Sequence, residues 1–264
     1  MFPGVAFSEA QMMSSLAAAW LPFMRIGGAL MTAPLFSAAY VPMRIRLMIA
    51  IFISAALLPF LNAGQAAGPL NLLGIEAVLL AGKELLIGIC LGFFLQLVFD
   101  AILVGGHLIA NGMGLGFAMM VDPQRGVQVP VLSQYLLIVT MLLFVVLDGH
   151  LAFLAMLVRS FQLWPVAGVG FSPDQFGLIV AQGGVIFSGA IQIAIPAVIA
   201  LLLVQISIGV ISRAAPTLNL FAVGFPLAML VGFLLLERIL PSLLPQLNSL
   251  LNGAYDAIGR FLGV

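Results

Sequence analysis

Residues 72–99 read LLGIEAVLLAGKELLIGICLGFFLQLVF, an apolar run in which only Glu76, Lys83 and Glu84 carry charge. About 20 consecutive apolar residues suffice for a helix to cross a bilayer. Backbone groups that lie in lipid must find their hydrogen bonds within the segment, which an α-helix achieves. This stretch therefore predicts a membrane helix and points to an all-α fold.

The composition of the whole chain agrees with membrane insertion. Of its 264 residues, 63% are hydrophobic and 7% are charged, whereas soluble proteins average about 25% charged residues. So few charges cannot coat a water-exposed globule of this size, so lipid or partner protein must cover much of the surface. The formal net charge is zero, and without a basic run there is no electrostatic attraction to nucleic acid.

Several further apolar stretches continue the pattern on both sides of 72–99. They lie near 10–36, 47–61, 102–121, 129–158, 176–211 and 217–250. The last two are long and contain prolines, which predicts bent helices and helical hairpins in a polytopic protein. The first is interpreted as retained and not as a secretory signal, because its first basic residue, Arg25, lies inside it. We find no linker and no internal repeat, so the chain is treated as one unit, 1–264.

Small residues form a stripe on one face of the 72–99 helix. At about 100° per residue, one face collects Gly74, Ala77, Ala81, Gly88 and Gly92, together with Glu84. Such a stripe lets two helix backbones approach closely.

Charged groups within apolar segments are the next candidates for function. Glu76 and Lys83 share a different face of the helix, and Asp100 follows at the end of the segment. Ionisable groups in lipid should pair or reach water. Structural pairing between helices and a role in ion or proton movement are both open. The candidate intramembrane or interface residues are Glu76, Lys83, Glu84, Asp100 and Arg213.

The stretch 105–123, GGHLIANGMGLGFAMMVDP, combines glycine with methionine. Each glycine weakens a helix by about 1 kcal/mol relative to alanine, so a rigid span is a poor explanation. Methionine adapts to irregular gaps, and the segment is a candidate deformable seal. A tightly packed re-entrant loop without a moving part is the alternative. The candidate seal residues are Gly112, Met113, Gly114, Phe117, Met119 and Met120.

Motifs for catalysis, cofactors or metals are missing from the sequence. Cys90 is the only cysteine, and His107 and His150 are the only histidines. Neither a His-Glu-x-x-His motif nor a P-loop is present. We therefore predict no enzymatic activity, no cofactor and no metal site. Asp148, Gly149 and His150 are instead interpreted as a polar break between two apolar runs.

Near the C-terminus, the run 211–227 reads ISRAAPTLNLFAVGFPL and resembles the signature of the FliR family, a component of the bacterial flagellar type III protein export gate. Met113–Phe117 ahead of Val121, Asp122 and Pro123 resembles the same family, and the similarity extends over nearly the whole chain. The signature residues are Pro216, Asn219, Phe221, Gly224, Phe225 and Pro226.

The resemblance implies a single copy assembled with several copies of FliP and FliQ into a pore for unfolded flagellar subunits in the bacterial inner membrane, at the flagellar basal body. Residues 1–171 would be the FliP-like part and 172–264 the FliQ-like hairpin. FlhB and FlhA are the implied neighbours. A virulence secretion (injectisome) homologue is an alternative use of this architecture. A self-contained secondary transporter is a further alternative, although transporters are expected to show internal repeats.

Overall fold

Every regular element that the structure describes is an α-helix. The structure is a computed structural model, and it describes residues 9–38, 41–60, 74–116, 130–166, 168, 171–214 and 220–263. Within these ranges there is no strand, which confirms the predicted all-α fold. The helices are α1 (Glu9–Thr32), α2 (Met43–Leu57), α4 (Ile75–Gly112), α6 (Val131–Val146), α7 (Gly149–Leu163), α8 (Pro173–Gln182), α9 (Gly184–Ala214) and α10 (Leu220–Leu262).

Among the described residues, three helical segments are long and apolar enough to cross a membrane. They are Ile75–Gly112, Pro173–Ala214 and Val223–Leu262. The α6–α7 pair would add a fourth if its two helices, bent by 66°, form one broken span. The prediction of a polytopic helical protein is confirmed by these lengths and compositions.

Helix α4 differs from its sequence-based prediction, because the apolar stretches 72–99 and 102–121 are not separate elements. One helix of 38 residues, Ile75–Gly112, runs through both. Asp100, expected at a segment end, lies inside it, half-buried and with an interaction partner. A single carboxylate does not break a helix when its own polar interactions are met, so charge alone was a poor guide to the boundary.

The C-terminus of α4 is closed by a Schellman motif. Gly114 adopts a left-handed backbone with φ 81°, a conformation that glycine adopts without steric cost. Its N–H donates to the carbonyl of Asn111, and the N–H of Leu115 donates to the carbonyl of Ala110, both at 3.0 Å. These bonds satisfy carbonyls that the end of a helix otherwise leaves free.

Asp148 separates α6 from α7. It has a left-handed backbone with φ 54°, a conformation that aspartate tolerates better than most residues. The two helices meet at 66°, so the polar break predicted at 148–150 is confirmed. The long proline-containing stretches form helices that continue through their prolines. Pro196 lies within α9, and Pro226, Pro241 and Pro245 lie within α10, without ending either helix.

The chain forms two compact units, and α4 and α10 contribute residues to both. Unit 1 comprises Met1–Gln96, Asp148–Ala181 and Ala254–Val264, and unit 2 comprises Leu97–Leu147 and Gln182–Gly253. The predicted boundary at residue 171 separates two parts by their similarity to other proteins. Contacts within this chain do not test such a similarity, so the boundary stays a prediction.

In unit 1, aromatic side chains from α4, α7 and α10 form one cluster. Phe261 is buried, and its ring lies 5.5 Å from Phe94, 5.4 Å from Trp164 and 5.9 Å from Phe171. Tilted ring pairs at such distances add to the stability that burial itself provides. The cluster therefore joins the middle of α4 to the end of α10.

In unit 2, glycines of α4 sit where other helices approach closely. A Cβ atom built on Gly105 would lie 3.2 Å from the carbonyl oxygen of Ala190, and one on Gly106 would lie 2.8 Å from Cα of Ser133. The inference that glycine makes 105–112 a poor helix is therefore wrong. Close packing against α9 and α6 stabilises the helix and outweighs the low propensity of glycine.

Candidate functional site

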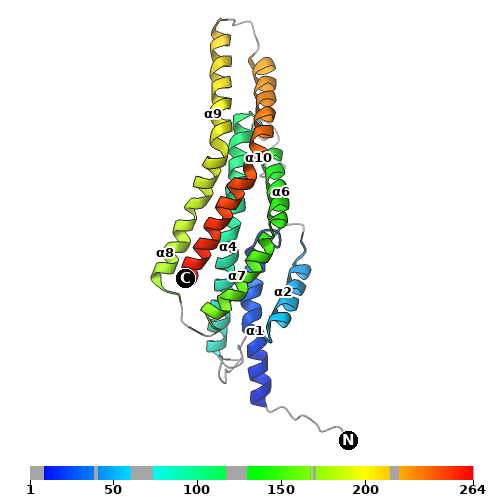
Figure 1. Cartoon of the computed structure of the whole chain (residues 1–264), viewed down its shortest axis with the longest axis vertical. Helices are drawn as coiled ribbons and strands as arrows, with labels where there is room; N and C mark the ends of the chain where they lie inside the picture. The colour runs from blue at the N-terminus through cyan, green and yellow to red at the C-terminus, as the bar shows by residue number, and fades with distance from the viewer. Residues whose placement is uncertain are drawn as a thin grey trace. The chain divides into compact units, whose positions relative to one another are not determined.

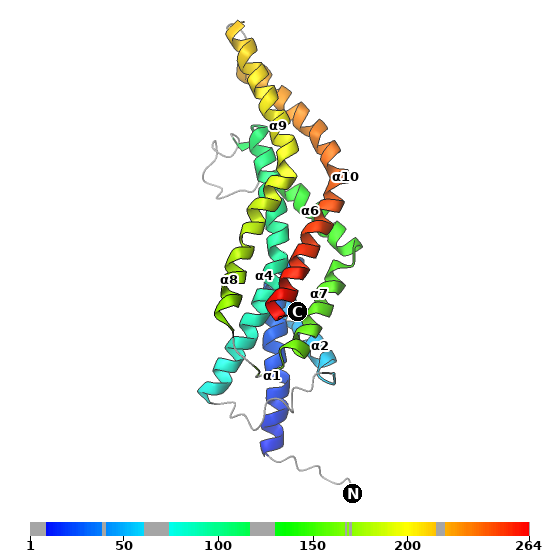
Figure 2. The same ribbon diagram turned by 60° about the vertical axis from the view of Figure 1, so that its left-hand side comes forward.

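Helices α1 and α4 lie side by side at very close range (Figures 1 and 2). A Cβ atom on Gly28 of α1 would lie 2.5 Å from the carbonyl oxygen of Leu85. On the facing helix, a Cβ on Gly88 would collide with the carbonyl of Arg25, and one on Gly92 with the Thr32 side chain. The small-residue stripe predicted for close helix contact is therefore used, by α1 of the same chain.

A buried ion pair lies in this helix contact. The Arg25 Nε donates a hydrogen bond of 2.7 Å to Oε2 of Glu84, and its Nη2 lies 2.6 Å from the same oxygen. Both side chains are completely buried. Two charges removed from water need such a direct partner, because an unpaired charge would cost several kcal/mol. The other carboxylate oxygen of Glu84 has no hydrogen-bond partner among the described residues.

Arg25 also binds the C-terminal end of α7. Its Nη1 donates to the carbonyl oxygen of Ser160 at 2.9 Å, and its Nη2 donates to that of Trp164 at 2.9 Å. The guanidinium carbon lies 4.3 Å from the centre of the Phe161 ring. The Ser160 carbonyl also accepts the N–H of Trp164 at 2.9 Å, so Arg25 is a second donor there. A cation at a helix C-terminus complements the helix dipole, and the ring adds a cation–π contact.

One arginine thus ties three helices together, and we call Arg25, Glu84, Ser160, Phe161 and Trp164 the charge lock. An arginine does not lose its proton in proteins, so the lock fixes positions and does not transfer protons. Sequence analysis identified Glu84 but not its partner. The available signal was a second ionisable residue of opposite sign inside another apolar stretch, and Arg25 was such a residue.

The remaining charged candidates lie elsewhere. Lys83 is half-buried and donates to the carbonyl oxygen of Gly168, while Glu76 is exposed in the first turn of α4. Asp100 belongs to unit 2, and Arg213 is exposed in the last turn of α9. The structure does not bring these four into the charge lock.

Part of the candidate seal lies in the described residues. Gly112 ends α4, and its carbonyl oxygen accepts a hydrogen bond of 2.8 Å from Gln205. Met113 is completely buried and packs directly on Gly232 of α10, where a Cβ atom would collide with it. Phe117, Met119 and Met120 lie outside the described residues, so the seal stays a prediction.

The C-terminal signature surrounds the start of α10. Gly224 is buried beside Ile208 of α9, whereas Phe225 and Pro226 are exposed. Phe221 belongs to the helix, although its side chain is not described, and Pro216 and Asn219 lie outside the described residues.

Comparison with known proteins identifies the family of this chain. The sequence pattern of the family "Bacterial export proteins, family 1" matches residues 16–254. The chain belongs to this family. It is 32% identical to the flagellar biosynthetic protein FliR of Escherichia coli (strain K12), over 91% of each chain. The FliR protein of Pectobacterium carotovorum is 31% identical, over 98% of this chain and 97% of its own.

A third FliR protein is similar over a somewhat shorter part of the chain. The FliR protein of Bacillus subtilis (strain 168) is 32% identical over 82% of this chain and 83% of its own. The resemblance to FliR noted in the sequence is therefore confirmed, and the chain is a membrane component of the flagellar export apparatus. The charge lock and the glycine contact beside it are features of this FliR-family chain.

Proposed function

We propose that this chain acts without catalysis, as part of a pore that it forms with FliP and FliQ and through which unfolded flagellar subunits cross the bacterial inner membrane at the basal body. FlhB and FlhA would be its neighbours. In this proposal residues 1–171 form the FliP-like part and 172–264 the FliQ-like hairpin. The flagellar names of its relatives favour this use over an injectisome.

The exposed apolar surface of α9 and α10 supports the proposal most strongly. Burial differs between the candidate spans over one apolar window of 18 residues in each. The buried share of this window is 22% in Pro173–Ala214 and 28% in Val223–Leu262, against 61% in Ile75–Gly112. Large side chains lie open along both helices, among them Phe187 at 67% and Phe233 at 54% exposure. Surfaces of this kind need lipid or partner helices to cover them.

The first prediction is that the chain depends on its partners. Expressed without FliP and FliQ, it should be degraded or aggregate, because much of α9 and α10 would lack its protein cover. The measurement is its lifetime after synthesis is stopped, with and without co-expression. Purification through a tag on this chain should recover FliP and FliQ with it. A long-lived, monodisperse monomer or homo-oligomer in detergent would instead support a secondary transporter.

A second prediction concerns the seal. If residues 105–123 close the export path, soft apolar side chains there exclude ions while adapting to a passing chain. Changing Met113, Phe117 and Met119 together to glycine should then raise membrane conductance to small ions, while export continues at least partly. The measurement is conductance in cells in which the complex is shown to be intact.

The packing alternative gives a different result in the same variants. The contact of Met113 with Gly232 makes a single Met113→Gly variant the control for lost packing. If the triple variant loses the assembled complex and export without an ion leak, the segment is structural. A variant that assembles, exports and shows no raised conductance to small ions would also contradict the proposal that this segment is a seal.

A further inference from the structure

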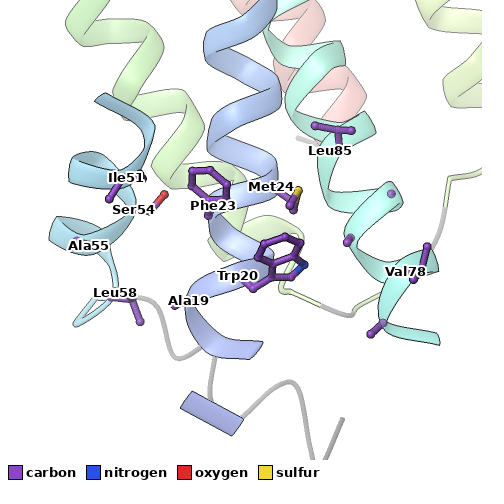
Figure 3. A pocket seen from close by; sticks show the side chains of 13 residues that line it. Ala19, Trp20, Phe23, Met24, Ile51, Ser54, Ala55, Leu58, Val78 and Leu85 are labelled. Carbon is purple, nitrogen blue, oxygen red and sulfur yellow. The ribbon is translucent and has the colours of Figure 1, made fainter. Parts of the chain in front are cut away.

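An open apolar cavity lies between α1, α2 and the start of α4 (Figure 3). Its volume is about 880 Å³, and none of its 13 lining residues is charged. The space exists because small residues, Ala55 on α2 and Ala81 and Gly82 on α4, form part of its walls. A Cβ atom added to Gly82 would meet nothing within 4 Å.

The hydroxyl of Ser54 faces this cavity. Ser54 is 5% exposed, and its hydroxyl has no hydrogen-bond partner among the described residues. Figure 3 shows its oxygen directed across the cavity toward Phe23 of α1. Ser207 of α9, by contrast, donates to the carbonyl of Leu203 at 2.8 Å, whereas the buried hydroxyl of Ser133 in α6, like that of Ser54, has no partner among the described residues. A buried, unsatisfied hydroxyl costs about 1–3 kcal/mol, so an acceptor from a ligand would be stabilising.

The cavity lies near the C-terminal end of α2 and the N-terminal end of α4, beside the middle of α1. Ser54 comes shortly before Leu57, the last residue of α2, and Ala77 comes shortly after Ile75, the first residue of α4. Trp20, on the α1 side, is 47% exposed. Tryptophan is enriched at the level where lipid headgroups meet the apolar layer, and this is also where phospholipids carry their ester carbonyls.

We propose that this cavity binds an acyl chain of a diester phospholipid, whose ester carbonyl accepts a hydrogen bond from Ser54. With no charged lining residue, the site selects for the acyl chain and the ester and not for the headgroup. A partner helix is the other apolar occupant. A helix is about 10 Å across and would rest on the exposed rim residues, such as Ile51 and Val78, leaving the buried hydroxyl unpaired.

The test removes either the donor of the proposed hydrogen bond, the Ser54 hydroxyl, or its acceptor, the ester carbonyl of the lipid. The full-length chain, in the complex with which it purifies, is delipidated, incubated with dioleoyl phosphatidylglycerol or its diether analogue, and analysed for bound lipid by mass spectrometry. The unaltered chain should retain the diester about five-fold better at this site, the ratio given by one hydrogen bond of about 1 kcal/mol. Ser54→Ala should lower diester binding to the diether level and leave diether binding unchanged.

Matched glycine variants test the cavity itself. Gly82→Leu fills the open space and should abolish the part of lipid binding that depends on Ser54. Gly27→Leu, at an α1 glycine that also has nothing within 4 Å of an added Cβ, should preserve it. A diazirine-bearing residue in place of Ala55 should cross-link to lipid. Equal retention of the two lipids by the unaltered chain, or a cross-link to a partner protein or second copy, would overturn the proposal.

Discussion

Replacing Arg25 with methionine is expected to destabilise the chain by about 3–5 kcal/mol, the usual cost of removing one partner from a buried ion pair. Methionine keeps much of the side-chain length, so the loss would be mainly electrostatic. Glu84 would remain buried without a cation, the Trp164 carbonyl would lose the Arg25 donor, and the Ser160 carbonyl would keep only the N–H of Trp164. The measurement is the thermal aggregation temperature of the purified complex, together with the amount of chain in the membrane.

Further variants separate the ion pair from the contact with α7. Glu84→Gln should cost less than Arg25→Met, because Arg25 would keep its bonds to the two carbonyls and its contact with the Phe161 ring. The double variant Arg25→Met/Glu84→Met should recover part of the loss, since no buried charge remains. Arg159→Met, at an exposed arginine of α7, is the control and should be close to neutral. A double variant no better than Arg25→Met would contradict the charge lock.

Replacing Gly88 with leucine should be almost as damaging, at about 3 kcal/mol, the upper end of the usual range for overpacking. A side chain there would collide with the carbonyl of Arg25. The backbone of α1 cannot move aside as a flexible side chain could, so α1 and α4 would separate. That separation would also stretch the Arg25–Glu84 pair, and the two losses should therefore be coupled.

Two adjacent glycines of α1 provide the comparison for this prediction. Gly28 faces the backbone of α4, whereas an added Cβ on Gly27 meets nothing within 4 Å. Gly28→Leu should lower the aggregation temperature as Gly88→Leu does, and Gly27→Leu should leave it nearly unchanged. Equal tolerance of leucine at all three positions would mean that the helices do not approach as closely as the structure has them.

The sequence predicted the helical class and part of the site for identifiable physical reasons. Helical periodicity placed Glu84 on the small-residue stripe, and the same stripe brings Gly88 and Gly92 against α1. Arg25 could not be paired with Glu84 from periodicity, because the pairing depends on how α1 and α4 are placed in space. The carbonyls at the end of α7 are backbone groups and leave no signal in residue type.

Local rules failed where tertiary packing decides the outcome. Asp100 and the glycines at 105 and 106 suggested breaks, yet α4 passes through all of them to Gly112. Close contacts with Ala190 and Ser133 explain the two glycines. Propensity is a weak prior when each helix packs against several others.

The mass of the intact complex, purified through a tag on this chain and measured by native mass spectrometry, tests the central proposal most directly. The proposed pore predicts one copy of this chain together with several copies each of FliP and FliQ. A mass that corresponds to this chain alone, or to a homo-oligomer of it, would contradict the proposal.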